Sequence, residues 1–256
     1  MNSQDHQHTI VKNLFKGAKI ELPAWKRTID LACCVIALPV LCLITVAMAI
    51  LLRLTSRGPI LFKQERVGFK GSRFMCYKFR TMVVGAETKS HQAYLTDLLG
   101  SRAPMVKLDA KGDNRMIRGA WLLRATGLDE LPQIINIFRG EMSVVGPRPC
   151  IPYEYDRYEP GQKERFNAVP GLTGLWQVSG KNRTTFAEMI DLDVRYSKKS
   201  SFWLDIRIIL MTIPALIIQV SDTRRARKSK TMSLQTPAIP SAALQNVKRS
   251  PHPVAQ

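Results

Sequence analysis

The longest uninterrupted apolar segment of the chain runs from Leu31 to Leu52, 22 residues without a charged side chain. A helix rises about 1.5 Å per residue, so an unbroken helix of this length could cross a hydrocarbon core of roughly 30 Å. Pro39 lies well inside the segment, where it removes a backbone donor and clashes with the preceding turn, so we expect a break there. A buried core helix is the alternative interpretation, and the length of the segment disfavours it.

Basic residues flank this apolar segment on both sides. They are Lys12, Lys16, Lys19, Lys26 and Arg27 before it, and Arg53, Arg57, Lys63, Arg66, Lys70 and Arg73 after it. Positive residues prefer the cytoplasmic side of a membrane, and a single crossing would export one of the two clusters. The pattern therefore predicts a re-entrant helix-break-helix over residues 31–52, which enters the membrane, bends at Pro39 and returns to the same face.

A second apolar stretch, Ile208 to Ile218, is interrupted by Pro214. It is too short to cross a membrane and predicts an interfacial helix. The following residues, 221–256, begin with a basic cluster and are rich in Ser, Pro and Ala, which predicts a disordered tail. We therefore expect an N-terminal tail over residues 1–25, one domain over residues 26–220 and a C-terminal tail over residues 221–256.

The 256 residues include 38 Lys plus Arg and 20 Asp plus Glu, a formal net charge of +18, and 45% are apolar. This apolar fraction excludes wholesale disorder. The basic excess favours a polyanionic partner: nucleic acid, an anionic membrane or a phosphorylated substrate. No helix-turn-helix, zinc or RNA-recognition signature is present, which argues against nucleic acid. The five cysteines have neither disulfide-framework nor metal-site spacing, so we expect reduced thiols.

Residues 74–80 alternate as a strand does, with apolar and aromatic side chains on one face and Lys78 and Arg80 on the other. Two cations about 7 Å apart on a strand can bind two phosphoryl groups. A solvated basic face is the alternative, and it is the stronger interpretation of this strand taken alone.

An acidic pair, Asp129 and Glu130, precedes an apolar segment that should end as a helix at Gly140. Thr126 and Asp129 have the spacing of a capping box, and Pro132 suits a first helical turn. The pair is therefore expected at a helix N-terminus, where the dipole keeps carboxylates ionised and attracts phosphate. An ionised Asp can act as a nucleophile, and an adjacent Glu can hold Mg²⁺. The alternative is that both acids simply cap the helix.

Two further cations lie near this pair in the sequence. Arg124 precedes Asp129 by five residues, and Arg148 follows the predicted helix between two prolines that stiffen its presentation. Several cations around one carboxylate pair suit a nucleotide diphosphate, whose charge must be neutralised before an anionic nucleophile can approach.

Taken together, these segments resemble the bacterial sugar transferase family, whose members are monotopic polyprenyl-phosphate phosphoglycosyl transferases. The resemblance covers residues 26–220, and the chain resembles the minimal catalytic form of the family. The sequences that carry it are Gly-Pro at 58–59, YKFRTM at 77–82, LDELPQ at 128–133, VGPRP at 145–149 and PGLTGLWQV at 170–178.

The resemblance implies a two-step reaction that initiates exopolysaccharide, capsule or O-antigen synthesis. Asp129 would attack the β-phosphorus of a UDP-sugar and release UMP, and undecaprenyl phosphate would then take the phosphosugar from the aspartate. Glu130 would bind Mg²⁺. The phosphate-binding candidates are Lys78, Arg80, Arg124 and Arg148. Asp193 matches another acidic position of the family, without an assigned role.

The expected fold is α+β and mainly α: a monotopic enzyme on the cytoplasmic face of the bacterial inner membrane. It combines the re-entrant helix with amphipathic interfacial helices and a small strand element. Pro39 matches the family's break proline, but Leu38 precedes it where the family has Ser. Expected partners are a UDP-sugar, undecaprenyl phosphate and anionic lipid, with the sugar and the oligomeric state left open. A non-catalytic membrane adaptor is the alternative, which explains the basic flanks but not the conjunction of motifs.

Overall fold

The computed structural model describes residues 22–56, 58–83, 105, 115–117 and 119–235, with the backbone alone for residues 182 and 226–235. The predicted tails lie outside the described residues, except for residues 22–25 and 221–235. The elements are α2 (Ala24–Thr55), β1 (Leu61–Val67), η1 (Phe69–Gly71), β2 (Arg73–Phe79), α4 (Ala120–Thr126), η3 (Leu128–Gln133), α5 (Ile134–Phe138), β3 (Ser143–Val145), α6 (Pro152–Tyr155), α7 (Pro160–Lys163), η4 (Glu164–Asn167), β4 (Gly171–Thr173), α8 (Leu175–Val178), η5 (Lys181–Arg183), α9 (Phe186–Lys199) and α10 (Phe202–Gln235). The described chain is thus mostly helical with little sheet, as expected.

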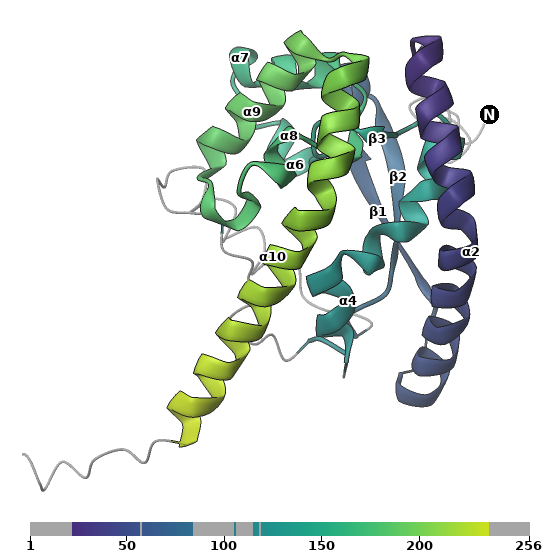
Figure 1. The fold of residues 1–256 in the computed structure, drawn as a ribbon, viewed down its shortest axis with the longest axis vertical. Helices are drawn as coiled ribbons and strands as arrows, with labels where there is room; N and C mark the ends of the chain where they lie inside the picture. Colours follow the sequence, from purple (N-terminus) through teal and green to yellow (C-terminus); the bar gives the residue numbers. More distant parts are fainter. Residues whose placement is uncertain (1–21, 57, 84–104, 106–114, 118, 236–256) are drawn as a thin grey trace, which may run out of the picture.

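The first apolar segment forms one helix, α2, whose 32 residues continue through Pro39 (Figure 1). The predicted helix-break-helix is therefore not confirmed. A proline removes one intrahelical hydrogen bond, and packing of both flanking halves can outweigh that loss. Cys34 before Pro39 is buried against the domain, and so are Met48 and Leu52 after it.

The second apolar stretch was predicted to be a short interfacial helix, and this length is wrong. It forms part of α10, which has 34 residues, continues through Pro214 and passes the predicted domain boundary at residue 220. Among the described residues, α2 and α10 are the two helices long and apolar enough to cross a membrane by length and composition. Both begin at the same end of the molecule, where the rings of Trp25 and Phe202 are 6.0 Å apart (Figure 1).

The strand predicted over residues 74–80 is confirmed as β2, which pairs antiparallel with β1. The register sets Lys78 opposite Phe62, Cys76 opposite Gln64 and Phe74 opposite Arg66. Directly opposite residues share a face, so these side chains lie on one side of the hairpin.

The helices around the hairpin connect it to the two long helices. The turn η3 and helix α5 pack against β2 and α2, burying Cys76, Ile134 and Ile137 between them. Helix α4 lies between the C-terminal parts of α2 and α10: Ala120 packs near Leu52, and Gln219 Nε2 donates to Ala125 O at 2.8 Å (Figure 1). The carboxylate pair of η3 is thereby placed beside β2.

The short strands β3 and β4 pair in parallel and approach each other closely after Val145. A Cβ on Gly146 would lie 2.1 Å from Val169 O, and a Cβ on Gly171 would lie 2.0 Å from Gly146 N. Both positions therefore require glycine, and the segment that follows Gly146 carries Arg148.

Candidate active site

Asp129 and Glu130 lie in the first turn of η3, as predicted. Helix α4 ends at Thr126, and Gly127, with φ of 73°, reverses the chain into η3. The predicted capping role of Thr126 is wrong, because its hydroxyl donates back to Leu122 O at 2.8 Å within α4. Asp129 is buried, with 8% of its surface exposed, whereas the Glu130 side chain is 39% exposed.

Lys78 pairs with this acidic turn. Its Nζ lies 2.8 Å from Glu130 Oε1, and the Lys78 side chain is 23% exposed. Strand β2 and turn η3 are adjacent elements, so the ion pair joins two segments 52 positions apart in the sequence. Of the two cations predicted on β2, Lys78 therefore forms an ion pair with one of the two predicted carboxylates, Glu130.

The buried thiol of Cys76 lies on the same face of the hairpin as Lys78 and Arg66. Burial is the main cause that raises the pKa of its thiol, and the charges of Lys78, Arg66, Glu130 and Arg148 also act on that thiol. The four charged residues come from β1, β2, η3 and the segment after β3, and Lys78 and Glu130 form an ion pair among them.

Arg148 joins this group through a tightly held backbone. Its N–H donates to Asp193 Oδ2 at 3.3 Å, and its carbonyl accepts from Arg165 Nη2 at 2.8 Å. Its side chain is 34% exposed, and its Nη1 lies 3.8 Å from Glu154 Oε2. The backbone is thus fixed while the side chain stays partly exposed to solvent.

Arg80 and Arg124, the other two predicted phosphate ligands, lie around the end of β2. The Arg80 guanidinium donates to Pro59 O at 2.7 Å and to Ser56 Oγ at 2.9 Å, and Arg80 is 5% exposed. Arg124 Nη1 donates to Thr81 Oγ1 at 3.3 Å. In this structure both guanidinium groups contact protein segments, and their role toward phosphate stays a prediction.

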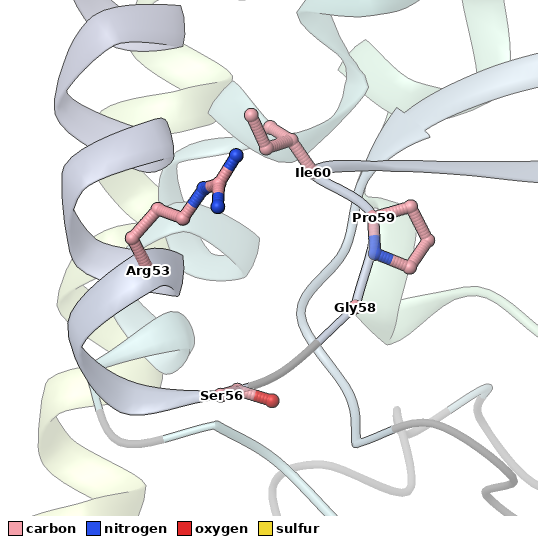
Figure 2. A pocket seen from close by; sticks show the side chains of 5 residues that line it. All are labelled: Arg53, Ser56, Gly58, Pro59 and Ile60. Carbon is pink, nitrogen blue, oxygen red and sulfur yellow. The ribbon is translucent and has the colours of Figure 1, made fainter.

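A hollow opens where α2 leads into β1. It is lined by Arg53, Ser56, Gly58, Pro59 and Ile60. Figure 2 shows the Arg53 side chain extending from α2 toward Ile60 across this hollow. The exposed Arg53 adds a cation at the edge of the domain beside the end of α2.

The sequence reasoning missed a buried polar cluster at the start of the two long helices. Lys26 Nζ lies 2.5 Å from Asp205 Oδ2 and donates to Val145 O at 2.9 Å. It also missed the fully buried pair of Arg165 and Asp193. Opposite charges at the starts of both apolar helices were a usable signal for the first cluster, but nothing in the sequence around Arg165 indicates its burial.

The site offers few ligands for a metal. Within the described ranges no three His, Cys, Asp or Glu side chains gather at one place. Asp129 and Glu130 supply carboxylate oxygens, the donor type that Mg²⁺ prefers, and Mg²⁺ commonly takes one or two carboxylates with substrate phosphates and water completing its shell. The donor chemistry of the pair thus fits Mg²⁺ held jointly with a diphosphate.

The family model described as bacterial sugar transferase matches residues 22–219. This range includes both long apolar segments, the β1–β2 hairpin, the Asp129–Glu130 turn and Arg148.

Three curated relatives share this region. A UDP-galactose-lipid carrier transferase of Erwinia amylovora is 41% identical over 75% of this chain and 40% of its own length. A UDP-glucose:undecaprenyl-phosphate glucose-1-phosphate transferase of Caulobacter vibrioides is 34% identical over 75% of this chain and 69% of its own length. The exopolysaccharide production protein ExoY of Sinorhizobium fredii is 33% identical over 75% of this chain and 85% of its own length.

The chain thus spans about two fifths of the Erwinia relative and most of ExoY. Because the family model matches well over half of the chain, the protein belongs to the bacterial sugar transferase family.

Proposed function

We propose that the protein transfers a sugar 1-phosphate from a UDP-sugar to undecaprenyl phosphate, as an initiating step of exopolysaccharide, capsule or O-antigen synthesis. The observation that carries this proposal is the Asp129–Glu130 turn, packed beside β2 with Glu130 2.8 Å from Lys78. The printed names of the relatives support it, since they include a UDP-sugar, a lipid carrier and undecaprenyl phosphate.

In the first step, an Asp129 carboxylate oxygen attacks the β-phosphorus of the UDP-sugar. The bond from that phosphorus to the bridging oxygen breaks, and UMP leaves with the bridging oxygen and its electron pair. In the second step, a phosphate oxygen of undecaprenyl phosphate attacks the same phosphorus, and the acyl phosphate bond breaks. The products are the undecaprenyl-diphospho-sugar and a regenerated Asp129 carboxylate.

The basic side chains neutralise the diphosphate so that the anionic nucleophile can approach it. We assign this role to Lys78, which pairs with Glu130, and to Arg148, whose charge acts on the same buried thiol, Cys76, as that of Lys78 does. Arg80 and Arg124 are proposed to act at the end of β2. Glu130 would hold Mg²⁺ together with the diphosphate, and the bound cation would withdraw charge from the leaving UMP.

We further propose that the protein is monotopic on the cytoplasmic face of the bacterial inner membrane. Both ends of α2 are attached to the same domain: Lys26 donates to Val145 O near the start, and Ser56 accepts from Arg80 just after the end. The opposite side of α2 exposes an apolar stripe of Ile36, Val40, Leu43, Ile50 and Leu54. A helix packed along a charged domain on one side suits the membrane interface better than a crossing.

The catalytic proposal is tested with Asp129→Asn in the full chain. We expect UMP release from a UDP-sugar to be abolished, while the protein keeps its fold and its vesicle binding. Glu65→Gln, which alters an exposed carboxylate on β1, should release UMP at the wild-type rate. Intact-protein mass spectrometry with the UDP-sugar and without acceptor should show a phosphosugar adduct in the wild type and none in Asp129→Asn. Near wild-type turnover by Asp129→Asn would contradict the nucleophile assignment.

The adaptor alternative has its own outcome in the same experiment. A wild-type protein that binds anionic vesicles and releases no UMP from any member of a UDP-sugar panel would favour it. The same panel, assayed with undecaprenyl phosphate, identifies the sugar.

The topology is tested by labelling. Ala24→Cys and Thr55→Cys, made separately in a Cys42→Ser background, introduce thiols at exposed positions at the two ends of α2. In a monotopic arrangement, a charged maleimide labels both positions in inside-out vesicles and neither in right-side-out vesicles. Labelling of the two positions from opposite sides would show a crossing.

A further inference from the structure

We propose that Asp193 and Arg165 are positioning residues of the transfer reaction, which fix the backbone on both sides of Arg148 and so hold its guanidinium toward the diphosphate. This inference rests on the proposed function. It concerns a buried pair that lies behind the site and does not itself face the substrate.

Hydrogen bonds connect Arg148, Asp193 and Arg165 in a closed ring. Asp193 Oδ2 accepts from the N–H of Arg148 at 3.3 Å, and Arg165 Nη2 donates to the carbonyl of Arg148 at 2.8 Å. The same Arg165 nitrogen also donates to Asp193 Oδ2. One ion pair thus binds both backbone polar groups of Arg148, from η4 on one side and from α9 on the other.

The neighbours of Arg148 are held in the same way, through backbone groups. On the β4 side, Gly146 N donates to Thr173 O and Gly171 N donates to Pro147 O, both at 2.9 Å. On the β1 side, Arg66 Nη1 donates to Pro149 O at 3.3 Å and Val67 N donates to Cys150 O at 2.9 Å. Segment 146–150 is therefore tied to β4 and to β1, in addition to the pair from η4 and α9. The side chain of Arg148, by contrast, is 34% exposed, and its Nη1 lies 3.8 Å from Glu154 Oε2. A rigid backbone with a partly exposed side chain is the arrangement that a substrate-binding arginine needs.

Stability does not account for this pair. Both side chains are 0% exposed, and Asp193 Oδ1 and Arg165 Nε have no hydrogen-bond partner. Removing two charges from water is costly, and apolar residues of similar size often replace a buried ion pair without loss of stability. What apolar residues cannot supply is a donor and an acceptor for the two backbone groups of Arg148.

Asp193 and Arg165 each act on the pKa of the other. Burial raises the pKa of the Asp193 carboxyl, and the Arg165 guanidinium opposes that rise. Burial acts to lower the pKa of the Arg165 guanidinium, but the facing Asp193 carboxylate and the neighbouring Tyr158 favour its charged form, so its pKa is raised overall. Arg165 Nη1 also donates to the Tyr158 hydroxyl at 3.0 Å. Arg165 is thus a fixed cation whose orientation is set from two sides.

The experiment measures UMP release by the full chain in detergent or vesicles, with kcat and KM determined for the UDP-sugar. We expect Asp193→Asn and Arg165→Lys each to lower kcat/KM by about a hundredfold, the size of effect that a misplacement of about 1 Å produces. The matched control is Glu164→Gln, which breaks an exposed ion pair with Lys198 between the same two elements, at 2.6 Å, and should leave kcat/KM unchanged.

A double-mutant cycle separates positioning from general damage. Arg148→Ala removes the guanidinium but keeps the backbone groups that Asp193 and Arg165 bind. If the pair acts through Arg148, adding Asp193→Asn to Arg148→Ala lowers kcat/KM by less than about threefold beyond Arg148→Ala alone. Losses that multiply in the double variant would overturn the inference, and so would an Asp193→Asn protein with wild-type kcat/KM.

If Asp193→Asn fails to fold, the double-mutant cycle combines Arg165→Lys with Arg148→Ala. Arg165→Lys keeps the positive charge but replaces the planar fork, so it cannot reach both acceptors in the same geometry. Failure of the proposed function is distinguishable, since it would leave the wild-type protein and the Glu164→Gln control without UMP release.

Discussion

Lys26 and Asp205 form an ion pair of 2.5 Å that joins the first turn of α2 to the first turn of α10. Both side chains are buried, with 8% and 2% of their surfaces exposed. The Tyr196 hydroxyl donates to Asp205 Oδ1 at 2.7 Å, so the pair belongs to a hydrogen-bonded cluster and not to an isolated contact.

Lys26→Met should destabilise the protein by roughly 3–5 kcal/mol, because it leaves the Asp205 carboxylate buried without its cation. The control is Arg73→Met, which breaks an exposed pair with Glu65 and should cost about 0–1 kcal/mol. Denaturant midpoints in one detergent compare the two variants. Equal shifts would contradict the structural importance of the Lys26 cluster.

Lys78→Gln should lower kcat for UMP release by about a hundredfold or more, as removal of one preorganised charged donor typically does. The side chain is partly exposed and pairs with Glu130 at 2.8 Å, so the fold should be retained. Lys78→Arg, which keeps the charge, should recover part of the activity. Steady-state kinetics decides this, and an unchanged kcat in Lys78→Gln would exclude Lys78 from the chemistry.

Gly146→Ala should destabilise the fold by about 3 kcal/mol or more and reduce activity. The added Cβ would lie 2.1 Å from Val169 O and would separate β3 from β4, moving the segment that carries Arg148. Gly161→Ala, in a helix with no atom within 4 Å of the added Cβ, is the control and should be neutral or slightly stabilising. Thermal unfolding and UMP release are measured for both, and a stable, active Gly146→Ala protein would refute the close approach.

Arg80→Gln should cost roughly 3 kcal/mol of stability, because the Arg80 guanidinium supplies the donors for Pro59 O and Ser56 Oγ where α2 leads into β1. KM for the UDP-sugar distinguishes this bridging role from phosphate binding. A variant with wild-type stability and a strongly raised KM would favour phosphate binding alone.

Because of Cys150, the free energy of unfolding should decrease as the pH rises above about 9. Burial is the main cause that raises the pKa of its thiol from 9.0 to about 12. Between these values the unfolded thiol has lost its proton while the folded thiol keeps it, so the unfolded state binds fewer protons and stability decreases as pH rises. By pH 10 this should amount to about 1 kcal/mol.

The Cys150 effect is measured as the change in denaturant midpoint between pH 8 and pH 10. Cys150→Ala should lose less stability over this interval than the wild type. Cys42→Ala, at an exposed position, should behave as the wild type does. Parallel pH profiles for all three proteins would contradict the raised pKa.

Local features of the fold were accessible to sequence reasoning. The alternation around Lys78 predicted β2, and the polar sequence around Asp129 predicted an acidic pair in a first helical turn. The error at Thr126 arose because the spacing of a capping box shows only that the residue types match, and it does not show that Thr126 lies at the start of a helix. Here Gly127 supplies the left-handed conformation that ends α4, and Thr126 belongs to the preceding helix.

Non-local features were not accessible in this way. The apolar stretch Ile208 to Ile218, interrupted by Pro214, predicted a short helix. In the structure α10 packs against α4 and β3, and those contacts outweigh one missing hydrogen bond at Pro214. The burial of Arg165 depends on Asp193 and Arg148, which lie 28 and 17 positions away. Such pairings follow from the assembled fold and leave no periodic signal.

The partners of Lys26 have a consequence for the order of synthesis. Val145 and Asp205 follow Lys26 by 119 and 179 positions, so α2 leaves the ribosome long before either has been made. During that interval the apolar helix begins with an unpaired ammonium group, which favours water and resists deep insertion. The ion pair with Asp205 can form only after α10 has been made, so the start of α2 lacks this partner until then.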